Sequence, residues 1–197
     1  MSFDSALKKA MLGNEFGKVP CVFAYKARAH ISKSKIDEFG EAVYIDIGEA
    51  STVKYAASQT RYIAAMNIAY DMLLSIYEID TSSLFAARLL DFSENDKNMV
   101  LKFLRSFKAR TNFEARIIGM QNAQQHAALE KISGFAEAKG IPIVEVDLFG
   151  GSKRHIAMDS KVGVSYDILE YDRLYRPGEL DNKATFEQFE RSITKKP

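Results

Sequence analysis

The chain has 197 residues, of which 47% are hydrophobic and 27% charged, and its 27 basic and 26 acidic residues give a formal net charge of +1. This balance excludes an intrinsically disordered chain, and the low content of glycine and proline excludes a collagen-like or linker-like one. A chain of this length can bury a sizeable core, so we expect one compact domain over residues 1–197, with a division near residue 92 into 1–92 and 93–197 as the alternative.

Cysteine content and apolar pattern favour a cytoplasmic protein. Cys21 is the one cysteine, so no intramolecular disulfide can form, and no Cys/His spacing suits a structural zinc ion. The N-terminal residues do not resemble a signal peptide, and no run of about 18 apolar residues predicts a membrane helix. We therefore expect a cytoplasmic location without membrane insertion.

The first part of the chain predicts two helices and two or three strands. Apolar residues at helical spacing predict a helix over residues 3–11. Alternation over residues 21–31 predicts one long strand with a basic outer face, and residues 43–47 are its expected hairpin partner. A broad apolar stripe predicts a long helix from residue 58 to 78, and residues 83–92 suit a helix or a strand, with strand preferred.

The middle of the chain predicts a helix and then a strand–helix–strand unit. Ser93 and the acids after it predict the N-cap of a helix that ends near Arg110. Residues 113–120, 123–139 and 141–149 follow as strand, helix and strand. Connections of this length indicate a right-handed βαβ unit with parallel strands, over residues 113–149.

The last part predicts an antiparallel meander, appended to the parallel pair of the βαβ unit, and then a short helix. Residues 155–158 and 162–168 alternate as strands with a turn between them, and a capping box at Thr185 begins the last helix. The predicted order is αββα(β)αβαβββα. It indicates an α+β or mixed α/β protein in which a helical layer crosses a largely antiparallel sheet.

Charge is unevenly distributed along the chain. Residues 18–35 hold five basic residues and no acid, residues 97–116 hold six basic residues and Glu114, and residues 37–96 hold eleven acids and three bases. The basic blocks either neutralise neighbouring acidic elements or converge on a patch for an anionic partner such as nucleic acid. The residues expected in such a patch are Lys26, Arg28, Lys97, Arg105 and Lys108.

Acidic residues give a second candidate site. Glu145 and Asp147 share one face of a predicted strand, and Asp159-Ser160-Lys161 follows in the next turn. An acid on one strand followed by acid-x-lysine resembles the metal-binding core of restriction-endonuclease-like nucleases. The resemblance implies that Asp147 and Asp159 would hold Mg²⁺ and that Lys161 would steady the attacking water. Otherwise these are surface carboxylates on an exposed sheet face.

The carboxyl edge of the βαβ unit gives a third candidate, a small-anion pocket. Ligands of open α/β sheets bind at this edge, where helix N-termini present free N–H groups. The residues expected there are Gln121, Asn122, Gly150, Gly151 and Lys153. The alternative is that the asparagine caps the helix and the glycines turn the chain.

Motifs for phosphate-loop, dinucleotide, zinc-protease and serine-hydrolase chemistry are missing from the sequence. We therefore expect a non-enzymatic binding or assembly protein without a cofactor, whose macromolecular partner is another protein or a second copy of the chain. The alternatives are a nucleic-acid-binding protein or Mg²⁺-dependent nuclease, and a small-molecule domain that binds an anion.

Overall fold

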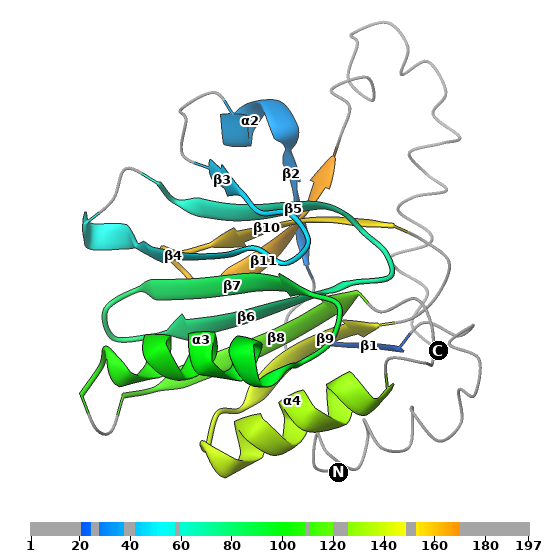
Figure 1. Ribbon diagram of the computed structural model, residues 1–197. Coiled ribbons are helices and arrows are strands. Elements are labelled where there is room, and N and C mark those ends of the chain that lie inside the picture. The colour runs from blue at the N-terminus through cyan, green and yellow to red at the C-terminus, as the bar shows by residue number, and fades with distance from the viewer. Residues whose placement is uncertain are drawn as a thin grey trace, which may run out of the picture.

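The computed structural model describes residues 21–24, 28–37, 42–57, 60–108, 111–119, 126–148 and 153–169. Within these ranges the protein is a mixed α+β structure, built from two mixed β-sheets and the helices packed against them (Figure 1). The helices predicted over residues 3–11 and after Thr185 lie outside the described residues. None of the described helices is long and apolar enough to cross a membrane.

The first sheet has six strands in the order β1-β9-β8-β6-β7-β4. These are β1 (Cys21–Ala24), β4 (Ala50–Lys54), β6 (Met72–Glu78), β7 (Ser83–Leu89), β8 (Phe113–Gly119) and β9 (Ile143–Leu148). β8 and β9 are parallel and α4 (His126–Ala138) lies between them in the chain, so the parallel pairing and the helix predicted for residues 113–149 are confirmed. The other strand pairs of this sheet are antiparallel.

The second sheet has five strands in the order β2-β11-β10-β5-β3. These are β2 (Ala29–Ser32), β3 (Ala42–Tyr44), β5 (Tyr62–Ile68), β10 (Arg154–Asp159) and β11 (Val164–Leu169). β10 and β11 form the predicted antiparallel hairpin. The hairpin belongs to the second sheet, however, and is not appended to the βαβ unit as we expected.

The helices and sheets stack in layers. α3 (Glu94–Arg105) and α4 cover the outer face of the first sheet, and α2 (Lys33–Asp37) lies on the far side of the second (Figure 1). Alternation along β6 shows how one strand serves two layers: Leu74 packs toward the helices, and Leu73 packs against Ile156 of the second sheet. A short 3₁₀ turn, η1 (Tyr55–Ala57), follows β4.

The N-terminus of α3 has the predicted cap. The Asp96 amide donates to Ser93 Oγ at 3.2 Å, and the Ser93 amide donates to Asp96 Oδ2 at 2.8 Å. This reciprocal pair satisfies two N–H groups that the helix would otherwise leave without partners. The helix ends at Arg105, five residues before the predicted end.

The helix predicted over residues 58–78 is wrong, because this segment forms β5 and β6. Both strands are buried on both faces, since helices or a second sheet cover each side of the sheet to which they belong. Apolar residues therefore occur almost without interruption, and the expected alternation of a half-buried strand is lost. The strand preferred for residues 83–92 is confirmed over Ser83–Leu89, which form β7; residues 90–92 lie after it.

The single strand predicted over residues 21–31 is also wrong. β1 pairs antiparallel with β9 in the first sheet, whereas β2 pairs parallel with β11 in the second. The expected hairpin partner, β3, instead pairs parallel with β5. Alternation within one segment does not show that the chain passes from one sheet to the other.

Candidate functional site

Seven charged side chains meet between the two sheets, near β1, β9 and β11. We call this group the ionic cluster; it consists of Arg28, Arg116, Arg154, Glu114, Glu145, Asp147 and Asp167. Its strands come from both sheets, so the cluster ties one sheet to the other. It includes Arg28 and Asp147, which the sequence placed in two different candidate sites.

Arg28 is the central cation of the ionic cluster. Its Nε donates to Glu145 Oε1 at 2.9 Å, and its Nη1 donates to Asp147 Oδ2 and to Asp167 Oδ1, both at 2.8 Å. Burial would lower the pKa of this guanidinium, but the charges of the three carboxylates outweigh burial and raise the pKa above its ordinary value. Arg28 is therefore fixed as a cation inside the protein and is not part of a surface patch.

The carboxylates around Arg28 have further donors. Arg154 Nε donates to Asp147 Oδ1 at 2.8 Å, and Ser165 Oγ donates to Glu145 Oε2 at 2.5 Å. Burial would raise the pKa of the Asp147 carboxyl, but the hydrogen bond and charge of Arg154, reinforced by Arg28, hold it below its usual range. Both oxygens of Asp147 and both of Glu145 are thus engaged by protein donors.

The structure does not bring the proposed metal-binding carboxylates together. Arg154, which binds Asp147, begins β10, and Asp159 ends it; six residues of extended strand span about 17 Å. Asp159 is fully buried and receives a hydrogen bond of 2.7 Å from Arg61 Nη2. Among the described residues, no three His, Cys, Asp or Glu side chains are grouped to hold a metal ion.

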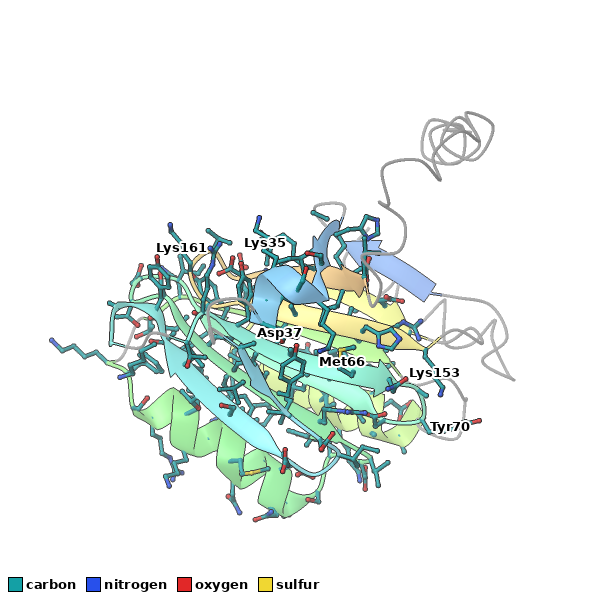
Figure 2. The ribbon with its side chains drawn as sticks, turned by 90° about the horizontal axis from the view of Figure 1, so that it is seen from above. Lys35, Asp37, Met66, Tyr70, Lys153 and Lys161 are labelled. Atoms are coloured by element: carbon teal, nitrogen blue, oxygen red, sulfur yellow. The ribbon has the colours of Figure 1, made fainter. Side chains whose placement is uncertain are left out.

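Lys161 and Lys153 flank β10 from opposite ends. Figure 2 shows them far apart across the second sheet. Lys161 belongs to the turn after Asp159, and its Nζ lies 5.5 Å from the centre of the Tyr55 ring. Lys153 is exposed, and the other four residues of the predicted anion pocket, Gln121, Asn122, Gly150 and Gly151, lie outside the described residues.

The described residues of the expected basic patch do not converge on one surface. Arg28 lies between the sheets, whereas Lys97, Arg105 and Lys108 lie on or after α3, on the other face of the first sheet. Lys26 lies outside the described residues. For Arg28 the structure matches the alternative interpretation, in which basic residues neutralise acids of neighbouring elements.

A second site lies between α3 and β4. We call it the α3–β4 groove; it is open and has a volume of about 340 Å³. It is lined by Ala50, Ser51, Thr52, Phe85, Met99, Lys102, Phe103 and Ser106. Phe85 and Phe103, whose ring centroids are 5.5 Å apart, form an apolar floor.

Four exposed basic residues lie on β4 and α3, the elements that line this groove, or shortly after α3, and we call them the basic rim: Lys54, Lys102, Arg105 and Lys108; Lys102 itself lines the groove. The Nζ of Lys54 lies 5.6 Å from the centre of the Phe107 ring, which places the end of β4 against the end of α3. In the described part of the chain none of the four forms a salt bridge, whereas lysines elsewhere do, with Asp37, Glu94 and Asp91 as their partners.

The helix dipole accounts for only part of the basic rim. Cations in the last turn stabilise a helix, and Lys102 and Arg105 occupy the last turn of α3. Lys54 and Lys108 lie outside the helix, so the dipole gives no reason for them. The sequence indicated the α3 residues through the charge of block 97–116. Lys54 is one of only three bases in the acidic segment 37–96, and its place near the end of α3 is seen only in the structure.

The two sites differ in whether their basic side chains have carboxylate partners. The ionic cluster matches its guanidinium groups to carboxylates, while the basic rim of the α3–β4 groove faces solvent. No protein-family model matches the chain, and no curated protein matches it. The groove is therefore the better candidate for binding another molecule.

Proposed function

We propose that this protein is a non-enzymatic binding protein that holds an acidic polypeptide segment in the α3–β4 groove. The observation that carries the proposal is an apolar floor, with Lys102 in its lining, on elements that also hold three further exposed cations; none of the four has a salt-bridge partner among the described residues. Apolar side chains of a partner would gain from burial on Phe85, Met99 and Phe103, and carboxylates would gain from the basic rim.

The groove offers little for catalysis. Of the described residues that line it, Lys102 is the only ionisable one, and the other polar side chains are the hydroxyls of Ser51, Thr52 and Ser106. A hydroxyl becomes a nucleophile when a general base lies within hydrogen-bonding reach. The lining supports recognition and not bond making or breaking.

Polypeptide fits the groove better than nucleic acid does. Nucleic-acid binding relies on many phosphate contacts, typically about 6 to 10 in a specific site, and the rim supplies four cations beside an apolar floor. A short acidic segment with interspersed apolar residues matches both features. Binding of a nucleic acid instead of a peptide is the alternative outcome that the experiment below distinguishes.

Fluorescence anisotropy with a labelled peptide of alternating glutamate and valine tests the proposal, with a labelled single-stranded oligonucleotide in parallel. The peptide is expected to bind, and Lys102→Glu with Arg105→Glu should weaken it by about tenfold or more, because each reversal replaces attraction by repulsion. Lys35→Glu with Lys139→Glu is the control, because both lysines are exposed, form no salt bridge among the described residues and give the same change in net charge; it should have little effect.

Three results would overturn the proposal. Peptide that fails to bind the unmodified protein, or that binds both double variants equally, shows that the groove is not the site. Oligonucleotide that binds in place of the peptide, and loses affinity in the α3 variant alone, assigns the same rim to nucleic acid.

A further inference from the structure

We infer that the acidic segment joins the first sheet as a seventh strand, beside β4, through main-chain hydrogen bonds to Ala50, Thr52 and Lys54. This inference rests on the proposed function and adds how the partner is held. β4 is the last strand of its sheet and pairs only with β7, so its other edge carries no strand among the described residues. Unpaired strand edges are templates for an added strand.

The hydrogen bonds at the two ends of β4 identify which residues face the open edge. Tyr55 donates to the carbonyl of Ser82 at 3.1 Å, and Arg88 donates to the carbonyl of Glu49 at 2.9 Å. In an antiparallel pair, bonding alternates from one residue to the next. Residues 49, 51, 53 and 55 thus bond to β7, and the N–H and C=O groups of residues 50, 52 and 54 point away from it.

Exposure agrees with this assignment. Ala50, Thr52 and Lys54 are all exposed, whereas Val53 between them is buried. The open edge is therefore accessible over the length of the strand.

β4 is better suited to strand addition than the other sheet edges. The two sheets have four edge strands, and β4 has five residues where β1 and β2 have four and β3 has three. Short edges are one of the ways in which proteins prevent strand addition. Among these four strands, only β4 also contributes residues to the groove.

Strand addition also explains why the groove and the basic rim lie together. Thr52 is opposite Phe85, which packs toward α3, so every second side chain of β4 lies on the helix side of the sheet. An added strand would likewise place every second side chain on that side, over the groove. Lys54 and Lys102 then favour carboxylates at alternate positions of the partner.

The groove has a charge gradient along its length. Glu94 and Asp96 lie in the first turn of α3, and the basic rim lies at its other end, where Lys54 contacts Phe107. A bound segment is therefore expected to place its acids toward Lys54 and its apolar side chains toward Ala50.

Amide hydrogen exchange followed by NMR tests strand addition on the whole protein, with the glutamate–valine peptide at saturation. The amides of residues 50, 52 and 54 should slow by about tenfold or more when the peptide binds, because they gain carbonyl partners. The amides of residues 51 and 53, already bonded to β7, are internal controls and should change little.

A chemical variant of the peptide provides a second measurement that leaves the protein unchanged. N-methyl groups on alternate peptide residues remove either the N–H groups that face β4 or those that face away. One methylated series should lose about tenfold in affinity for each blocked hydrogen bond, and the other should bind normally. Thr52→Pro, which removes an edge N–H without touching the bonds to β7, should weaken binding while Thr52→Val does not.

The outcomes separate the two proposals. Peptide that binds and depends on the basic rim, but leaves residues 50, 52 and 54 unprotected and tolerates both methylated series, overturns strand addition and leaves the proposed function standing. Peptide that does not bind overturns both.

Discussion

The space between the two sheets has an apolar half and a charged half. In the apolar half Leu73 and Ile118 of the first sheet pack against Ile63 and Ile156 of the second. In the charged half the ionic cluster fills the same space. One row of residues across the first sheet crosses the border: Ala86, Ser75, Arg116 and Glu145 are successive neighbours on β7, β6, β8 and β9.

The difference indicates that the two halves contribute differently to the stability of the fold and to the register of its strands. Apolar contacts are non-directional and tolerate small shifts of one sheet over the other. Hydrogen-bonded charges require one particular strand register. A slip of β9 by one residue would turn Glu145 and Asp147 to the other face of the sheet, away from their partners. We infer that the apolar half supplies stability and that the charged half fixes the register of β9 against its neighbours, a role in which buried ion pairs are retained despite their desolvation cost.

Arg28→Met should produce the largest fall in the free energy of unfolding, because it removes the central cation of the charged half. The substitution leaves the carboxylates of Glu145, Asp147 and Asp167 without their shared cation, and such a loss costs about 3 to 5 kcal/mol. Urea denaturation at neutral pH measures it. Leu73→Ala, a fully buried truncation in the apolar half, is the reference variant and should cost about 3 kcal/mol.

Compensation distinguishes a charge effect from a packing effect. If unpaired carboxylates cause the loss, adding Glu145→Gln and Asp147→Asn to Arg28→Met should recover part of it. A loss below about 1 kcal/mol for Arg28→Met would contradict the comparison, since surface ion pairs have that magnitude.

Local signals in the sequence were enough for part of this fold. Ser93 with Asp96 marks the start of α3, and Gly140, with φ of +64°, ends the helical segment of the βαβ unit. Residues 58–78 were predicted as a helix because β5 and β6 are covered on both faces, so their apolar residues do not alternate with polar ones. Whether a strand is covered on one face or on both depends on tertiary packing and cannot be read from the local sequence.

The candidate sites show a sharper limit. Arg28 and Asp147 are both recognisable as functional candidates in the sequence, but they are 119 residues apart and only strand pairing brings them together. The sequence therefore assigned one to a basic patch and the other to a metal site. Nothing in the sequence marked Lys54 as a candidate binding residue, because its role depends on its position near the basic C-terminal end of α3.

Acid should weaken the charged half before the apolar half. The pKa of Asp147 is held below its ordinary value, so its contribution to stability is complete above the unfolded pKa of about 4 and is lost as pH falls through the lower folded value. The free energy of unfolding should therefore fall with pH below about 4. Asp147→Asn should be less stable at neutral pH and less sensitive to acid; curves that stay parallel over this range would show that Asp147 is not responsible.

Ser75→Ala should have the smallest effect and locates the border between the halves. Ser75 is 1% exposed, and neither its Oγ nor Nη1 of Arg116, its neighbour on β8, has a hydrogen-bond partner among the described residues. Removing a buried hydroxyl without a partner is expected to change stability by about 1 kcal/mol or less, toward greater stability. Ser165→Ala removes a hydroxyl that donates to Glu145 and should instead cost about 1 to 2 kcal/mol, so it is the matched control. If Ser75→Ala is as harmful as Ser165→Ala, the hydroxyl of Ser75 must be hydrogen-bonded in solution, through an internal water shared with Arg116. The charged half would then extend one strand further, from β8 to β6, and the apolar half would begin at β7.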